Sequence, residues 1–135
     1  MRLWHKDLID VLPKQQLLGQ WRECCCIARN IAVNGTPNHI LVNKIMDYSA
    51  DHFFTYAKLI EEEMKRRGYK CNFDNFLHWY GVHHFVYHDE LFRGWHNIRY
   101  LFQCFRNLEE KYDCGGIASK EFDLIWEKYC QAIMS

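Results

Sequence analysis

Apolar residues recur in this sequence at the three- to four-residue spacing of one helix face, and no stretch sustains the alternation of apolar and polar residues that marks a β-strand. The pattern therefore predicts an all-α fold of four or five helices. The expected helices span Lys14–Ile31, Ala50–Arg67, Asn75–Phe85, Asp89–Tyr112 and Ser119–Ala132.

Turn formers and capping residues separate these stretches. The residues that we expect to begin or end helices are Pro13, the turn Asn34–Pro37, Ser49, Gly68, Gly115–Gly116 and Ser119. Residues 38–48 are expected to form a connection. Residues 1–12 are a short, apolar-rich segment, and we expect this N-terminal segment to pack on the first long helix.

The size of the chain suits one core. Its 135 residues, 49% of them hydrophobic, predict a single domain over residues 1–135. No apolar run approaches the ~18 residues that a membrane span needs. Charged residues within the first ten positions exclude a signal-peptide core there. We therefore expect a soluble protein with no membrane partner.

The cysteines favour a reducing, cytoplasmic location. There are seven, an odd number, and three of them are consecutive, Cys24–Cys26, while no C-x-x-C pair occurs. Neighbouring residues on a helix point about 100° apart, so these three cannot pair with one another or hold one metal ion together. We expect reduced, largely buried thiols, with neither a disulfide nor a structural metal.

Charge alone gives little support for a nucleic-acid partner, because 17 basic residues balance 17 acidic ones. Residues 1–70 hold eleven Lys and Arg against eight Asp and Glu, and residues 71–135 hold six against nine. The basic excess of the first half is small. Within residues 1–70, the spacing of Glu61–Glu63 and Lys65–Arg67 favours ion pairs along a helix. We interpret these residues as a solvated surface.

A histidine-rich region invites a metal assignment. His78, His83, His84 and His88 lie close to two acidic residues, but no H-E-x-x-H or similar spacing occurs. Aromatic residues surround the region, so packed or interfacial histidines are the favoured interpretation. Side-chain nucleophiles are also poorly supported, since there is no Gly-x-Ser-x-Gly motif and no glycine-rich phosphate loop.

The pair Arg22-Glu23 stands in the middle of the first long helix, within reach of the N-terminus if residues 1–12 fold back. An α-amino group is less basic than a lysine amine, so it is available as a nucleophile at neutral pH. A carboxylate beside it can stabilise a cationic intermediate and move protons. From the residues alone, an ordinary salt pair at the edge of the core is the simpler interpretation.

The first 25 residues, MRLWHKDLIDVLPKQQLLGQWRECC, resemble the opening of the pyrimidine-dimer DNA glycosylase family, small all-helical repair enzymes of phages and bacteria. The residues that carry the resemblance are Arg2-Leu3, Leu12, Gln15, Leu17 and Arg22-Glu23. The bacterial branch is similar almost letter for letter over MRLWH, LP-x-QQLLGQ and RECC. A looser likeness continues at residues 38–39, 58–69 and 87–90.

The resemblance implies a base-excision enzyme that acts on damaged double-stranded DNA without a metal or cofactor. In this family an N-terminal α-amine attacks C1′ of a damaged pyrimidine nucleotide and forms a Schiff base, and β-elimination then cuts the strand. Carried onto this chain, Met1 supplies the amine and Glu23 the catalytic carboxylate. Arg2 should block removal of Met1, so the retained amine is that of Met1.

The resemblance also implies binding residues. Arg22 would clamp a phosphate or the substrate, Arg2 matches the family's arginine next to the nucleophile, and His39 matches a histidine near the DNA. A second family arginine falls at Cys26 here, and Arg29, one turn later, is its candidate replacement.

Two further hypotheses stay open. The first is a non-catalytic member of the same fold that binds or sequesters a nucleotide under Arg2, Arg22 and Glu23, a function that the many aromatic residues would suit. The second is a helical protein-interaction domain. The oligomeric state and the identity of the lesion or nucleotide do not follow from the sequence.

Overall fold

The computed structural model describes residues 1–81 and 86–135, and within this described part the chain is helical and has no strand. In chain order the elements are the 3-10 helix η1 (Lys6–Val11), α1 (Lys14–Asn34), the 3-10 helix η2 (Asn43–Asp47), α2 (Ala50–Arg66), α3 (Asp74–Tyr80), α4 (Ile98–Asp113) and α5 (Ser119–Met134). The all-α prediction is confirmed. None of these helices is long and apolar enough to cross a membrane.

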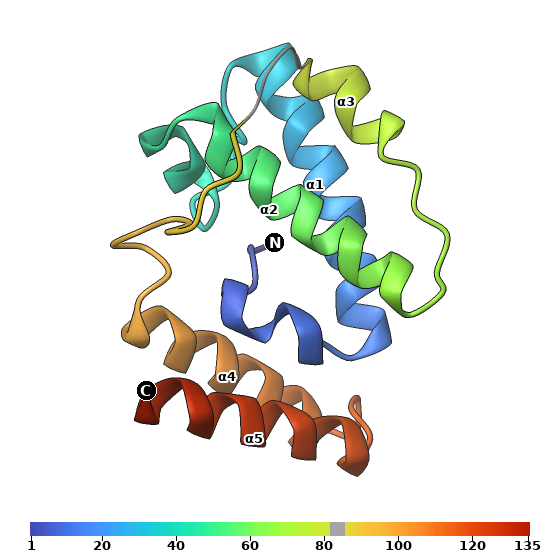
Figure 1. Cartoon of the computed structure of the whole chain (residues 1–135), viewed down its shortest axis with the longest axis vertical. Coiled ribbons are helices and arrows are strands. Elements are labelled where there is room, and N and C mark those ends of the chain that lie inside the picture. The colour runs from blue at the N-terminus through green and yellow to red at the C-terminus, as the bar shows by residue number, and fades with distance from the viewer. Residues whose placement is uncertain (82–85) are drawn as a thin grey trace.

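The helices form two layers with the N-terminal segment between them (Figure 1). Helices α1 and α2 pack against each other, and α3 packs on α1. Helices α4 and α5 form a pair, and η1 contacts α5 on one side and α2 on the other. The segment that contains η1 therefore lies between the two layers.

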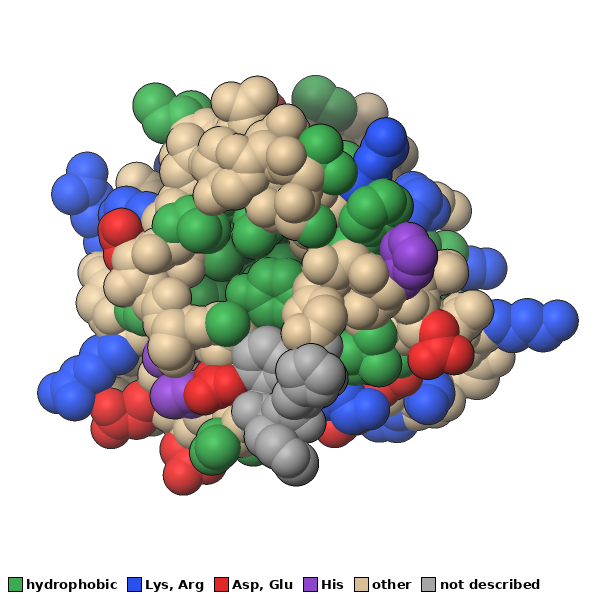
Figure 2. Space-filling view, turned by 90° about the horizontal axis from the view of Figure 1, so that it is seen from above, with side chains coloured by type: hydrophobic (Ala, Val, Ile, Leu, Met, Phe, Trp, Pro, Cys, Tyr) green, Lys and Arg blue, Asp and Glu red, His purple; other side chains and the backbone are tan. Residues whose placement is uncertain are grey.

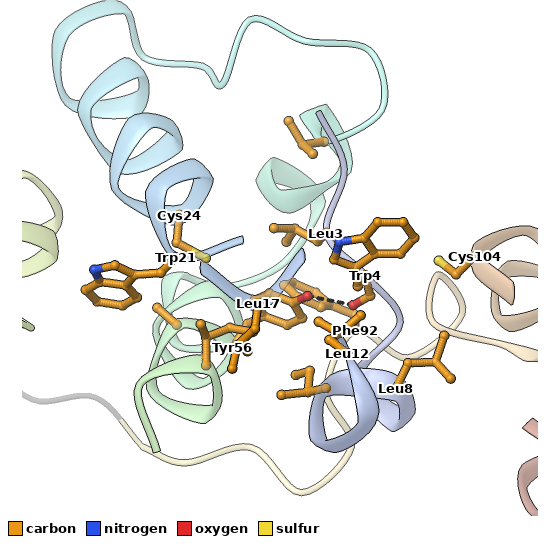
Figure 3. Packing of buried hydrophobic residues seen from close by; sticks show 14 of the residues in the cluster. Leu3, Trp4, Leu8, Leu12, Leu17, Trp21, Cys24, Tyr56, Phe92 and Cys104 are labelled. Atoms are coloured by element: carbon orange, nitrogen blue, oxygen red, sulfur yellow. Dashed lines mark hydrogen bonds between the residues drawn. The ribbon is translucent and has the colours of Figure 1, made fainter. Parts of the chain in front are cut away.

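Residues 1–12 contribute much of the core. Leu3, Trp4, Leu8 and Leu12 are buried among residues from α1, α2 and α4 (Figure 3). This confirms that the N-terminal segment packs on the first long helix. Because these side chains leave water on folding, the hydrophobic effect fixes the segment in place.

Helix α1 follows the predicted apolar stripe and runs three residues further than expected. Pro13 occupies its N-cap position, and Leu17, Trp21 and Cys24 are buried along one face. The helix ends where Gly35 adopts a left-handed conformation with φ +78° and donates its N–H to the carbonyl of Ile31 over 2.8 Å. Such a C-terminal position favours glycine.

The acidic cluster of α2, Glu61–Glu63, was predicted to lie on a solvated surface, and the structure contradicts part of this prediction. The expected ion pairs form, including Lys65–Glu61 at 3.3 Å and Arg67–Glu63 at 2.7 Å. However, Glu61 and Glu63 are only 3% and 7% exposed, so they do not lie on a solvated surface. Arg67 also donates to the carbonyl of Leu12 over 2.7 Å, and the chain around η1 thus covers the Glu63 side of α2.

The predicted helix Asp89–Tyr112 begins too early, because α4 starts only at Ile98. Phe92 and Gly94 have φ of 54° and 88°, values that a right-handed helix cannot contain. The Asn97 side chain then caps α4 by accepting the N–H of Tyr100 over 2.9 Å. Residues before Ile98 instead cross α2, where the N–H of Phe92 is donated to His52 Nδ1 over 3.0 Å.

The remaining boundaries differ by small amounts. Helix α3 ends at Tyr80 rather than Phe85, and residues 82–85 lie outside the described part. Ser49 stands at the N-cap of α2 without a side-chain hydrogen bond. Ser119 is the first residue of α5, whose N-cap is Ala118. The expected connection 38–48 contains η2.

Candidate nucleic-acid site at the N-terminus

The residues that precede η1 are held by side chains of α1 and α4, and the described part of the chain has no strand beside them. Gln20 on α1 accepts the N–H of Trp4 over 2.7 Å and donates to the carbonyl of Arg2 over 2.9 Å. Tyr100 on α4 donates its hydroxyl to the carbonyl of Leu3. The backbone is therefore fixed from two layers of the fold at once.

Glu23 lies directly beside this segment. Its Oε2 accepts the backbone N–H of Arg2 over 3.4 Å and an N–H of Gln20 over 3.3 Å. Successive backbone nitrogens are separated by at most about 3.6 Å, so the α-amine of Met1 lies within about 7 Å of this oxygen. Met1 itself is 38% exposed, which leaves the amine end of the segment open to a ligand.

Arg2 turns its guanidinium toward α4. Nη1 lies 3.8 Å from Sγ of Cys104, and the group stands 5.6 Å from the ring centre of Trp4. Arg2 also lines a hollow of about 320 Å³ together with Leu41, Tyr100 and Gln103. The hollow opens beside the N-terminus.

A second hollow, of about 340 Å³, continues the first and shares three of its lining residues. It adds Lys44 from the η2 region and Arg99 from the start of α4. No acidic residue lines either hollow. We call the joined hollows the cationic groove, defined by Arg2, Lys44 and Arg99.

Arg22 lies on a different surface from Glu23. It is exposed and lines a hollow of about 420 Å³ between α1 and α3, together with Trp21, Cys25, Asn75, His78 and Trp79. Figure 3 shows that Trp21 points away from Leu3 and Trp4 across α1. Arg22 and Glu23 were expected to share one pocket. In the structure they face different surfaces of α1.

Arg29 joins Arg22 on this side of the molecule. Its guanidinium lies 5.8 Å from the ring centre of Trp79, a cation–π geometry. Cys26, at the position of the family's second arginine, is exposed on α1. Arg29 thus contacts α3.

An apolar hollow adjoins this side at the end of α1. It has a volume of about 400 Å³, and Ile31, Ile45, Met46 and Trp79 are among its lining residues. Figure 2, seen from the top of Figure 1, shows hydrophobic side chains gathered at the centre of that face. Trp79 therefore lines both this apolar hollow and the hollow that contains Arg22.

His39 shapes the loop before η2. Its backbone N–H is donated to Asn43 Oδ1 over 2.9 Å, and its Nδ1 accepts the N–H of Leu41 over 3.3 Å. Because Leu41 lines both hollows of the cationic groove, His39 orders one wall of that groove.

The cysteine run is only partly buried. Cys24 is in the core, and burial raises the pKa of its thiol well above the usual value. Burial also raises the pKa of Cys25. Since a thiolate is the nucleophilic form, neither residue suits catalysis. The exposure of Cys26 contradicts the expectation that the run lies on a buried face.

The two described histidines that the sequence offered as metal ligands, His78 and His88, lie in different surroundings. His88 stacks on His52 with ring centres 4.0 Å apart and lies 3.7 Å from Asp51. His78 is exposed on α3, and His83 and His84 lie outside the described residues. Among the described residues, no three His, Cys, Asp or Glu side chains are arranged to hold a metal ion.

The sequence interpretation missed several residues of the site. The sequence around Tyr100, Lys44 and Arg99 does not mark these residues as part of the site, because only folding brings them to it. Gln20 could have been identified from the sequence. It follows Leu17 by three residues and precedes Cys24 by four, so it places a polar side chain on the apolar stripe of α1. A buried amide at such a position requires partners.

Comparisons with known proteins bear on the same region. The family model described as pyrimidine dimer DNA glycosylase matches residues 1–77, which include the N-terminal segment, Glu23 and the η2 wall of the cationic groove. The searches of curated proteins and of solved structures each returned no match. The family match covers more than half of the chain, and the chain therefore belongs to the pyrimidine dimer DNA glycosylase family.

Proposed function

We propose that this protein is a DNA glycosylase with AP-lyase activity on damaged pyrimidines, in which the α-amine of Met1 is the nucleophile. One observation carries the proposal: the backbone N–H of Arg2 is donated to Glu23 over 3.4 Å, which sets the α-amine beside a carboxylate. Family membership supports damaged DNA as the substrate class.

The reaction needs only an amine and a carboxylate. The neutral amine attacks C1′, so that a C–N bond forms while the bond from C1′ to the pyrimidine breaks and the base leaves with the electron pair. The nitrogen lone pair then forms the C=N bond as the C1′–O4′ bond opens and O4′ takes a proton. Loss of a proton from C2′ expels the 3′ phosphate and cuts the strand.

Glu23 has two tasks in this scheme. Among the described residues, both hydrogen bonds to Glu23 involve Oε2, and Oε1 takes part in none. Oε1 is therefore available to receive the proton that the attacking amine releases. The negative charge of the carboxylate also stabilises the iminium cation that follows.

The cationic groove is the proposed path of the DNA backbone. Arg2 supplies positive charge next to the amine, Lys44 and Arg99 supply it in the adjoining hollow, and no acidic residue lines either hollow. Phosphate neutralisation supplies most non-specific affinity for DNA. A balanced net charge is compatible with this function because the relevant charge is local.

A borohydride experiment tests the function. Duplexes that carry one abasic site or one thymine dimer are incubated with the protein and borohydride, and we expect a covalent adduct and an incised strand. Glu23→Gln should slow incision by roughly 10²- to 10³-fold while Kd changes little. Glu127→Gln, an exposed change on α5, is the matched control. Absence of adduct and incision on both duplexes refutes the proposal.

One observation favours the alternative, a catalytically inactive member that binds a nucleotide. The hollow between α1 and α3 combines the guanidinium of Arg22 with the half-exposed ring of Trp79, a pairing that suits phosphate and base together. Tight binding of a free nucleotide by a protein that gives no adduct would establish this alternative. Nothing in the described structure specifically favours a protein-interaction domain.

A further inference from the structure

The carboxamide of Gln20 joins the N-terminal segment to Glu23. It is 1% exposed and makes four hydrogen bonds: Oε1 accepts from the Trp4 N–H and from the Tyr56 hydroxyl, and Nε2 donates to the Arg2 carbonyl and to Glu23. We propose that Gln20 is a positioning residue that sets the register of residues 1–4 and so holds the α-amine at Glu23. This inference rests on the proposed function of that amine.

The four partners allow only one orientation of the amide. Turning it over would place the NH₂ group against the N–H of Trp4, and the oxygen against the Arg2 carbonyl and the Glu23 carboxylate. Each of these contacts sets donor against donor or acceptor against acceptor. With both protons and both lone pairs engaged, the amide is fixed and serves as a template for the segment.

The contacts of Gln20 replace those of a neighbouring strand. It binds the carbonyl of Arg2 and the N–H of Trp4, two groups on alternate residues that a β-strand partner would bind. A slip of the segment by one residue would break both bonds. These two bonds therefore specify the register of the segment against α1.

Tyr56 supports this template from α2. It is fully buried, and its hydroxyl oxygen lies 2.6 Å from the Trp4 carbonyl and 2.9 Å from Gln20 Oε1. Burial raises the pKa of this phenol well above its usual value, so the hydroxyl keeps its proton and shares it between the two acceptors. Tyr56 thus joins the amide oxygen to the segment. The dashed line in Figure 3 marks its bond to the Trp4 carbonyl.

A displaced amine should slow the reaction without weakening binding. Gln20 is too deeply buried to touch DNA, so its loss acts only through residues 1–4 and Glu23. A misplacement of about 1 Å in a reacting group costs roughly a hundredfold in rate. We expect Gln20→Leu to lower the single-turnover rate of Schiff-base trapping by roughly 10- to 100-fold, with Kd for abasic DNA within about threefold of wild type.

Two variants and one control make the test specific. Gln20→Leu removes all four bonds, and Tyr56→Phe removes only the hydroxyl group that bonds Trp4 and Gln20, with an expected loss in rate of roughly 2- to 10-fold. Asn30→Leu is the control, since it removes a side-chain amide from the same helix that donates to the Pro37 carbonyl, away from the N-terminus. If Gln20→Leu fails to fold, the trapping rate of Tyr56→Phe still tests the inference.

Order in the segment is measured independently of activity, from the ¹⁵N heteronuclear NOE and hydrogen exchange of the Trp4 amide. We expect wild type and Asn30→Leu to keep this amide ordered and protected, and Gln20→Leu to lose both properties. An ordered Trp4 amide in Gln20→Leu, or a mobile one with an unchanged trapping rate, overturns the inference. A wild-type protein that traps no DNA would instead refute the proposed function, while the amide measurement would still decide whether Gln20 holds the segment.

Discussion

Arg22 and Glu23 are neighbours in the sequence, but their side chains leave α1 about 100° apart and serve different surfaces. Glu23 contacts the N-terminal segment, and Arg22 lines the hollow against α3. The sequence could identify both as candidates through the family resemblance. It could not tell that they are separated, because the separation depends on where the N-terminal segment and α3 pack around the helix.

Arg22 should still contribute to ligand binding. Replacing it with alanine removes a charged hydrogen-bonding group from an exposed hollow, with an expected loss of about 1.5–3 kcal/mol, or roughly 10- to 150-fold in affinity for DNA or a nucleotide. Arg22→Lys should restore part of this loss, since lysine lacks the planar fork. Titrations at fixed salt compare both with Arg106→Ala, whose arginine pairs with Glu109 on α4. Unchanged affinity in Arg22→Ala would show that this hollow is not part of the binding surface.

Lys44 and Arg99 are expected to contact phosphates in the cationic groove. Each alanine variant should lower the slope of log K against log salt by about 1, because each phosphate contact releases about one counterion. The effect should be equal on undamaged and damaged duplexes, since backbone contacts carry no sequence information. A slope identical to that of wild type in both variants would place the DNA elsewhere.

At the level of elements, the sequence located the helices well where the apolar stripe was regular, as in α1 and α2. It failed at residues 89–97, where helix-compatible residues adopt turns because Phe92 and His52 lock that stretch onto α2. The sequence also wrongly predicted that Glu61 and Glu63 are solvated. The same spacing of acidic and basic residues occurs whether water or a neighbouring element covers the ion pairs. Long-range packing decides both cases.

One tether between elements is open to direct measurement. Arg67 bonds Glu63 within α2 and also the carbonyl of Leu12 next to η1. Arg67→Met should lower the free energy of unfolding by about 1.5–3 kcal/mol, because a buried carboxylate and a carbonyl both lose a charged donor. Urea unfolding followed by circular dichroism measures the change. A loss below about 0.5 kcal/mol, typical of exposed ion pairs, would show that the tether contributes little.

At the scale of the whole molecule, stacked histidines link the N-terminal segment to the chain that enters α4. The rings of His5 and His96 lie 5.0 Å apart, and His96 Nδ1 accepts the N–H of Lys6 over 3.0 Å. Burial lowers the pKa of both imidazoles, and the nearby Lys6 lowers both further, while Asp7 opposes the shift at His5. Both rings are therefore neutral in the folded protein near neutral pH.

This pair predicts acid sensitivity. Because the folded pKa values lie below the unfolded value of about 6.5, the unfolded state binds more protons as the pH falls, and stability is lost from about pH 6.5 downward. The slope should reach up to about 1.4 kcal/mol per pH unit for each imidazole. Unfolding free energies between pH 7.5 and 5 should fall less steeply in His96→Gln. Equal slopes in the two proteins would contradict this account.

The central claim is that the α-amine of Met1 reacts beside Glu23. Peptide mapping by mass spectrometry, after borohydride trapping on abasic DNA and nuclease digestion, locates the modified nitrogen directly. The account predicts that the reduced sugar remnant is attached to the α-amine of the N-terminal peptide, and that acetylation of this amine abolishes trapping. A remnant attached to a lysine side chain, or an N-terminal peptide without any modification in a protein that cuts the strand, would contradict it.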